Sequence, residues 1–581
     1  MSVSSVFAAQ CLSEAYTRPG GLVPDMPSPT LPSPLSREEI IFFFRGLPSG
    51  PHLIARTGAP WKKPRTGPYT TPYDRELRVV GEHAIAVPGV WENQVGPALL
   101  KVLDEENVKW NTIDLHRIHY VDFNDEAPFP VVVCIGVKPG TLSGEDGAPV
   151  AKRCQEVLDS FSLNDVEVAI KASERFQSVA PAPAFEEPRR TVFESDPVVK
   201  LRIPFTPTVG FPLSTDARPD AEGSSGFFFI NGEDTSKVYL LTARHVVLET
   251  TARDKNTVYD HKSTSKRRQN VTVFGQKGIN EHMKSIRVAI GMQYITIDIE
   301  QGRVNRAQGE VNKTQEQDAK VVRVWTSELE RAQRSLEKAQ NAVKDLEKLY
   351  EDVAKLYLSN LGRTLGFVSH SPPIGFCLGE HMYTEDVAII EVDSSKIKPD
   401  TFRPNVLDLG FEFELPTLTM MLRPRWDTEA PPPFKYPRDR LLRLHSIIPD
   451  SELRDPQEKD SNGDRCIVVL KRGRTTGLTV GRINNVPSYT RTYWEDGTAD
   501  VSMEWPIFGY GYDSKKPRDA FSEPGDSGSA VVDSKGRIAG IITGGAGFRP
   551  ASDITYMTAV EFIYNQMLTR GIEMNVNFTL P

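Results

Sequence analysis

The chain has 581 residues, which is too many for one hydrophobic core and predicts roughly two to four domains. Its 69 lysines and arginines against 77 aspartates and glutamates leave a net charge of -8, which argues against a broad phosphate-binding surface and so against nucleic-acid partners. The 39% hydrophobic and 25% charged residues are typical of a soluble globular protein. No apolar run approaches the roughly 20 residues of a membrane-spanning helix, so we expect no membrane partner.

The cysteines and the N-terminus point to an intracellular protein. The first basic residue is Arg18, and no long apolar stretch surrounds it, so we expect no signal peptide. The cysteines are odd in number and widely spaced, which favours reduced thiols over a disulfide framework or a zinc site. They are Cys11, Cys134, Cys154, Cys377 and Cys466. We therefore expect no metal and no cofactor, and a cytoplasmic protein, with the nucleus as the alternative compartment.

Residues 1–70 are rich in proline, glycine and serine and are predicted to be largely irregular, with one short helix in "SREEIIFFFRGL". Residues 75–175 change character and predict a small α+β domain without a recognisable catalytic constellation. Its helices are expected in 95–108 and 147–161, and its strands in 114–123, 129–137 and 165–172. Residues 176–194, with "SVAPAPAFEEP", read as a stiff, extended linker.

Residues 195–581 are dominated by short strands and turns, which favours an all-β barrel or sandwich over a parallel sheet. A hairpin is expected where two apolar runs flank Asn231-Gly232. Further strands are predicted in 294–300, 386–392, 465–470, 529–532 and 538–544. A terminal helix is expected in "AVEFIYNQMLTRG", ending at Gly571.

One segment breaks the β pattern and predicts a helical insertion at about 310–360. Apolar or small residues alternate at spacings of three and four, which is the core repeat of a coiled coil. They are Val322, Trp325, Leu329, Ala332, Leu336, Ala339, Val343, Leu346, Tyr350, Val353 and Tyr357. A 36-residue helix would be about 54 Å long. Its stripe needs a partner: a second copy through residues 322–357, the preceding segment or the barrel wall, and we favour packing within the chain.

The stretch Gly525-Asp526-Ser527-Gly528-Ser529 is a candidate nucleophile turn. A serine that attacks an acyl carbon needs its Oγ exposed at a tight turn, a base for its proton and N–H groups that bind the oxyanion. Gly525 allows the backbone to present its own N–H beside that of Ser527. A strand, "SAVVD", follows the turn, so this is not the strand-to-helix elbow of the α/β hydrolases. The bland alternative is an ordinary turn, since these residue types also make turns.

Two further segments supply the other groups that the serine needs. His245 follows the strand and the Thr-Ala pair of "VYLLTARHVV", where the small Ala243 leaves room behind an imidazole. Asp386 begins the strand of "TEDVAIIEV" and is the expected carboxylate that orients the histidine. Asp298 lies nearer to His245 along the chain, but it sits inside a predicted strand and lacks a small residue two positions on. We therefore favour Asp386.

In this order, "TARHV", "EDVAII" and "GDSGSAVV…GIITGG" resemble the trypsin-like (chymotrypsin-fold) serine endopeptidases. "SSGFFFI" resembles the start of that family's first barrel. "KRGRTTGLTVGRI" resembles the strand pair that opens the second barrel in intracellular members, including poorly characterised fungal and plant proteins. The resemblance covers residues 195–581. It implies a mainly β, two-barrel protease domain with a long helical insertion, preceded by the small α+β domain.

The resemblance also implies roles for individual residues. Ser527 matches the nucleophile, His245 the general base and Asp386 the orienting carboxylate, while the N–H groups of Gly525 and Ser527 match the oxyanion hole. The substrate would be a protein or peptide. Thr543, Gly544 and Gly545 match the strand that pairs with substrate backbone, and Phe521 falls at the floor of the specificity pocket, which argues against basic side chains there.

This chain departs from the family at Asp526, which in activated members pairs with a newly freed N-terminus. Roughly 200 residues precede the protease region here, so Asp526 needs another partner or none. Two alternatives to an active protease stay open. One is a catalytically silent trypsin-like scaffold that binds peptides or protein partners, and the other is an unrelated β-rich binding protein. The second requires three coincidental motifs in the right order.

Overall fold

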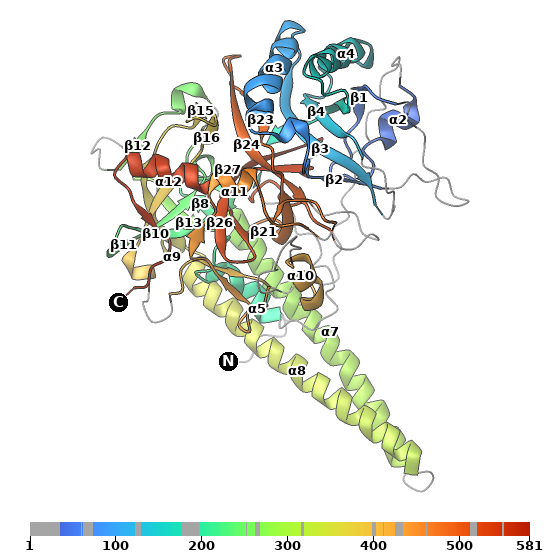
Figure 1. The fold of residues 1–581 in the computed structure, drawn as a ribbon. Helices are drawn as coiled ribbons and strands as arrows, with labels where there is room; N and C mark the ends of the chain where they lie inside the picture. Colours follow the sequence, from blue (N-terminus) through green and yellow to red (C-terminus); the bar gives the residue numbers. More distant parts are fainter. Residues whose placement is uncertain are drawn as a thin grey trace.

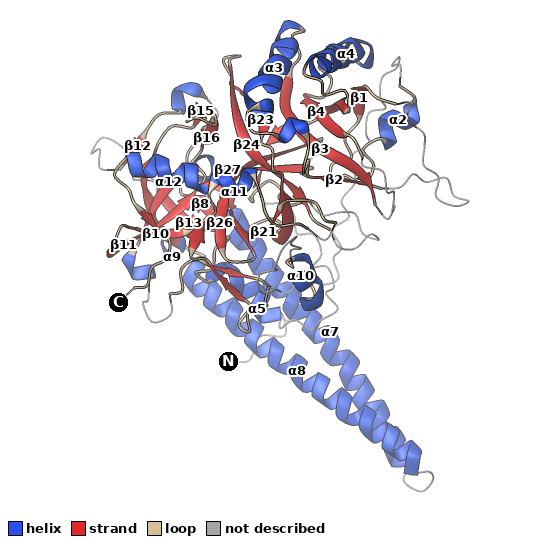
Figure 2. Cartoon of the chain, viewed as in Figure 1, coloured by secondary structure: helices blue, strands red, loops and turns tan. Residues whose placement is uncertain are grey.

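The structure is a computed structural model that is mainly β, with two large sheets in the body and one long helical arm that projects from it (Figure 1; Figure 2). It describes residues 35–59, 61, 74–121, 129–176, 180–181, 197–250, 252–261, 268–314, 319–397, 402–410, 412–423, 434–460, 462–511, 520–548 and 551–580. Most of the predicted linker 176–194 therefore lies outside the described residues.

The strands between residues 212 and 392 form a ring of antiparallel strands, which we call the upstream circuit. Its order is β8 (Pro212–Thr215), β13 (Asn270–Val273), β14 (Thr364–Ser371), β17 (Ala388–Val392), β11 (Asp234–Thr242) and β10 (Phe228–Asn231). The ring closes because β9 (Arg218–Ser224), which pairs with β8, continues along the chain into β10. Five of its strands each contribute at least one fully buried side chain to the same core, among them Leu213, Leu240, Val271, Val368 and Ile390.

The strands between residues 467 and 559 form a second ring, which we call the downstream circuit. Its strands are β21 (Ile467–Gly473), β22 (Gly477–Ile483), β24 (Ala499–Gly509), β27 (Ile554–Ala559), β26 (Arg537–Gly547) and β25 (Ala530–Asp533), which pairs back to β21. The terminal helix α12 (Val560–Thr569) follows β27 directly, and Gly571 comes two residues after its end, at φ +76°. The predicted hairpin at Asn231-Gly232 and the strands predicted in 386–392, 465–470, 529–532 and 538–544 are all present.

The N-terminal unit has the predicted helices and strands and two further strands, at 53–56 and 75–78, that were not predicted. It shares a sheet with the downstream circuit. Its elements are α2 (Arg37–Phe42), β1 (Leu53–Arg56), β2 (Arg75–Arg78), α3 (Gly96–Glu105), β3 (Trp110–Tyr120), β4 (Val131–Val137), α4 (Gly144–Ser160) and β5 (Val166–Ala172). β3 pairs with β23 (Ser488–Tyr493), which pairs with β24, so the sheet is continuous. Buried apolar side chains of both parts form one cluster.

The helical arm is a hairpin of two helices, α7 (Gln276–Thr314) and α8 (Ala319–Tyr357), that connects the neighbouring strands β13 and β14 (Figure 1). Its helices lie side by side and are linked by Tyr294 to Glu347 at 3.0 Å and by Arg303 to Glu328. The heptad stripe of α8 packs against the preceding helix α7, one of its three predicted partners, and Ala332 and Leu346 in the stripe are fully buried. Self-association through residues 322–357 stays a prediction.

Two sequence-based expectations about the arm are wrong. The insertion begins at Gln276, not near 310, and the strand predicted over 294–300 lies inside α7. β-branched residues at 295–297 and 299 favour a strand locally, but packing of this segment along α8 overrides that weak preference. Asp298 is consequently an exposed helical residue. It belongs to no strand that could hold its carboxylate beside His245.

Candidate active site

The register of the upstream circuit brings His245 and Asp386 together. Thr242, the last residue of β11, pairs with Ala388, the first residue of β17, so the residues beyond these two strand ends lie next to each other. His245 lies in the short helix α6 (Arg244–Val247) that follows Ala243. Its Nδ1 is 2.5 Å from Oδ2 of Asp386, and its backbone N–H donates to Asp386 Oδ1 at 3.1 Å.

This pair defines the protonation of the site. The Asp386 side chain is fully buried, and burial alone would raise its pKa, but the charge and the hydrogen bonds of His245 outweigh burial and lower the pKa of Asp386. The carboxylate therefore accepts a hydrogen bond from Nδ1–H of His245. That leaves Nε2 of His245 as the ring nitrogen able to accept a proton.

Ser527 lies in the loop Gly525–Ser529, which we call the serine loop. This loop packs on the upstream circuit, although the strand that follows it, β25, belongs to the downstream circuit. Its carbonyl accepts a hydrogen bond from Ser224 N, at the end of β9, at 2.9 Å. Ser224 Oγ donates to the carbonyl of Gly525 at 2.8 Å. A Cβ on Gly528, whose φ is +86°, would lie 2.2 Å from Thr242 Oγ1, so only glycine permits this approach. The serine loop thus packs on the strand end that precedes His245.

Two backbone N–H groups in this loop are candidates for binding a ligand. Within the described part of the chain, the N–H groups of Gly525 and Ser527 donate to no protein acceptor, whereas those of Asp526, Gly528 and Ser529 do. Gly525 has a φ of +101°, a conformation that favours glycine. Such a pair of free N–H groups beside a serine is the arrangement that binds an oxyanion.

Asp526 has a partner that the sequence analysis did not identify. Lys471 Nζ lies 3.0 Å from Asp526 Oδ2, and both side chains are fully buried. The carboxylate also accepts hydrogen bonds from the N–H groups of Thr475 and Glu523 and from the hydroxyl of Thr476. A lysine at the end of the apolar run of β21 is the only signal that the sequence offered for this ion pair.

One contact expected of a catalytic triad is missing. Among the described residues, Nε2 of His245 is buried without a hydrogen-bond partner, so it is not bonded to Ser527 Oγ. Ser527 is 4% exposed and His245 is 3% exposed. Catalytic hydrogen bonds are often long in structures without substrate and tighten only in the complex.

The predicted substrate-binding residues lie around this loop. Thr543, Gly544 and Gly545 belong to β26, whose Ile542 carbonyl accepts a hydrogen bond from Gly528 N at 2.8 Å. Phe521 is buried in the downstream core, its ring centroid 5.9 Å from Lys471 Nζ. No observation tests whether Phe521 forms the floor of a specificity pocket, so that role stays a prediction.

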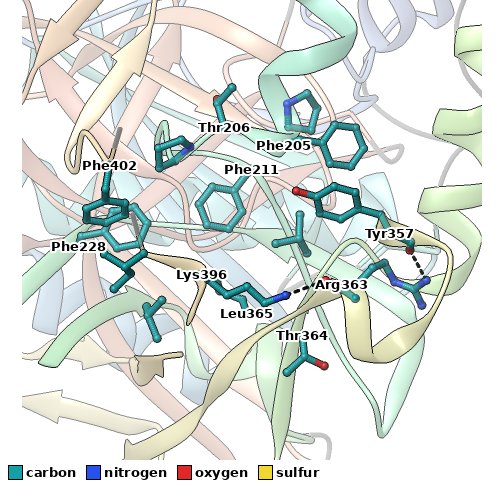
Figure 3. A pocket seen from close by; sticks show the side chains of 16 residues that line it. Phe205, Thr206, Phe211, Phe228, Tyr357, Arg363, Thr364, Leu365, Lys396 and Phe402 are labelled. Carbon is teal, nitrogen blue, oxygen red and sulfur yellow. Dashed lines mark hydrogen bonds between the residues drawn. The ribbon is translucent and has the colours of Figure 1, made fainter. Parts of the chain in front are cut away.

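A separate pocket of about 190 Å³ lies at the base of the arm and includes none of these residues (Figure 3). Aromatic side chains, among them Phe205, Phe211 and Tyr357, line it.

Among the described residues, no cluster of histidine, cysteine or acidic side chains could hold a metal ion. No helix in the same part of the chain is both long enough and apolar enough to cross a membrane.

Comparisons with known proteins add little to this geometry. No protein-family model matches the chain, and no curated protein matches it either. One similar solved structure is the inactive form of a serine-to-alanine mutant of Rv3671c from M. tuberculosis H37Rv. The two are 12% identical, the match covers 68% of this chain and 96% of the other, and the TM-score is 0.22. A similarity at this level carries no argument about fold or function.

Proposed function

We propose that this protein is a serine endopeptidase that hydrolyses peptide bonds of protein or peptide substrates through an acyl-enzyme. The observation that carries the proposal is the buried His245–Asp386 pair together with the serine loop packed on the strand end that precedes His245. Among the described residues, two N–H groups of this loop have no protein acceptor. In this proposal the two circuits are the two barrels of a trypsin-like protease, and the catalytic groups lie between them.

Each group then has a defined step. His245 Nε2 takes the proton of Ser527 as Oγ attacks the substrate carbonyl, and Asp386 stabilises the imidazolium that forms. The N–H groups of Gly525 and Ser527 bind the oxyanion, and loss of one such donor typically lowers kcat by about 10²–10³. His245 then gives the proton to the leaving amine, and water hydrolyses the acyl-enzyme by the same steps.

A small fluorophosphonate probe tests this proposal. Ser527 Oγ should attack phosphorus and displace fluoride, so that intact-mass analysis and peptide mapping find one probe on Ser527. Ser527→Ala should abolish labelling, and His245→Ala should slow it by about 10³-fold or more, because the base is lost. Ser534→Ala, in the turn that follows the same strand β25, should label like the wild type.

The alternative is a catalytically silent scaffold that binds peptides or protein partners. The observation on its side is that His245 and Ser527 share no hydrogen bond among the described residues, an arrangement that active enzymes without substrate also show. Folded protein that no fluorophosphonate labels, with circular dichroism like that of the Ser534→Ala variant, would support the scaffold and refute the protease.

A further inference from the structure

The edge of β26 nearest to Ser527 is shared by three segments of the chain. β25 covers it first, with Ala530 paired to Ile541. The serine loop comes next, through Gly528 N to Ile542 O and Ile542 N to Ser529 O. The opposite edge is covered by β27 from Gly540 to Ala546. An extended peptide acylated at Ser527 would therefore pair with β26 just beyond Ile542, along Thr543, Gly544 and Gly545.

A segment of the N-terminal unit already occupies the far part of this edge. The strand β6 (Glu174–Phe176) pairs antiparallel with β26, with Phe176 opposite Gly545, Arg175 opposite Ala546 and Glu174 opposite Gly547. This is the direction and the edge that a peptide bound at Ser527 would use.

A second short strand pairs with the segment that is hydrogen-bonded to Ser527. The strand β7 (Ala180–Pro181) pairs with β9, with Ala180 opposite Glu222, and β9 ends at Ser224, whose N–H is bonded to the carbonyl of Ser527. Four peptide units span at most about 14 Å between Phe176 and Ala180. The two strands therefore flank the serine loop at a separation that one short extended peptide can bridge.

Arg175 anchors β6 through a buried ion pair. Its guanidinium donates to Glu504 on β24, and the two side chains are 5% and 0% exposed. Glu504 also accepts hydrogen bonds from Thr384 Oγ1 at 3.0 Å and from Thr543 Oγ1. Thr543 belongs to the predicted substrate-binding strand, so this carboxylate lies directly behind the peptide edge. A buried carboxylate that lost its cation there would be left without a counter-charge.

We propose that Glu504 is an arginine-recognising group in the substrate groove and that Arg175 fills it as part of an intramolecular, substrate-like segment. The inference rests on the proposed protease function. The substrates of the open enzyme are then extended peptides that carry an arginine opposite Ala546. This position is distinct from the pocket predicted at Phe521, and the segment must leave β26 before such a peptide binds.

Two matched peptidyl probes test this inference. They are acetylated pentapeptide diphenyl phosphonates that copy residues 174–178, with the phosphonate replacing the last carboxyl group, and they carry either arginine or alanine at the second position. Ser527 Oγ forms a bond to phosphorus, phenoxide leaves, and the serine proton ends on phenol through His245. The antiparallel register of β6 places the second residue of each probe opposite Ala546.

In the wild type, both probes should label slowly because β6 holds the edge. Arg175→Ala should label at least 10-fold faster with the arginine probe, and in this variant the arginine probe should outpace the alanine probe by at least 10-fold. Arg175→Ala/Glu504→Gln keeps the groove open but should lose the preference. This double variant also removes the unpaired charge, so it protects the test against misfolding. Arg153→Ala, at an exposed arginine, should behave like the wild type.

Equal rates of the two probes in Arg175→Ala, or equal rates in the wild type and Arg175→Ala, would overturn the inference and leave β6 as a structural link. The small fluorophosphonate tests the protease function separately from the arginine-recognising site. If it labels Ser527 in neither protein, the protease function fails, whereas labelling without probe discrimination removes only the arginine site.

Discussion

At the scale of single residues, Lys471 is the partner that Asp526 was predicted to need in the absence of a newly freed N-terminus. Asp526 lies between the two candidate oxyanion donors, so its position sets the conformation of the loop. Lys471 comes from β21, inside the same chain and fully buried, and requires no cleavage to form its ion pair. We therefore expect the oxyanion hole to be formed without proteolytic activation.

Lys471→Met tests this role because methionine keeps most of the volume but removes the charge. Loss of one partner of a buried ion pair should cost about 3–5 kcal/mol of unfolding free energy. Displacement of the oxyanion donors should slow fluorophosphonate labelling of Ser527 by about 10²-fold. Urea unfolding and labelling rates measure the two effects, and Lys344→Met, on the exposed face of the arm, is the control. Unchanged labelling would show that Lys471 is only structural.

At the scale of elements, the arm is tied to the body at its base. His282 of α7 contacts the rings of Phe205 and Phe274, at centroid distances of 5.1 and 5.2 Å, and its Nε2–H donates to the carbonyl of Leu201 at 2.9 Å. Burial lowers the pKa of His282 to about 4, against the weaker opposing effect of that hydrogen bond. The imidazole is therefore neutral in the folded protein near pH 7.

This lowered pKa predicts an acid-sensitive arm base. In the unfolded chain a histidine takes a proton below about pH 6.5. In the folded protein His282 stays neutral down to about pH 4. The free energy of unfolding therefore falls as the pH decreases from about 6.5 to about 4. The shift corresponds to about 3 kcal/mol. Urea unfolding should measure the loss of unfolding free energy between pH 7 and pH 4. This loss should be smaller in His282→Gln than in the wild type by about this amount, and glutamine keeps a donor for the carbonyl of Leu201. Identical losses would contradict the prediction.

At the scale of the whole molecule, the N-terminal unit is part of the same β-rich body as the downstream circuit. Its β3 extends the sheet of the downstream circuit, and Asp553 of that circuit accepts hydrogen bonds from Ser49 N and Oγ at 2.8 and 2.7 Å. Lys171 Nζ lies 3.7 Å from the same carboxylate, and both side chains are fully buried. Removing the unit would expose a sheet edge and leave Asp553 without these partners.

A chain that starts at residue 195 should consequently fail to fold. We expect it to aggregate in size-exclusion chromatography and to show no fluorophosphonate labelling. Co-expression with residues 1–176 should recover a soluble, labelled complex, because the contacts between the two parts are non-covalent. A monodisperse and fully labelled 195–581 chain would show instead that the N-terminal unit is an accessory.

Local pattern determined much of this protein from sequence alone. Helical periodicity located α3 and α4, Asn231-Gly232 located a hairpin, and the small residues around His245 and Ser527 marked the candidate site. The same signals misplaced residues 294–300, where β-branched side chains predict a strand but the neighbouring helix α8 supplies the packing for α7.

Tertiary structure alone decided the remaining features, since each depends on groups far apart in the chain. The partner of Asp526 is 55 residues away, and that of Arg175 is 329 residues away. A buried lysine or glutamate gives no sequence signal until the opposite charge is placed beside it, because its cost of burial is met only by that partner. Short strands such as β6 likewise carry too little pattern to reveal which edge they cover. The sequence by itself thus located most elements and the candidate site residues, and only the fold decided which charges and edges meet.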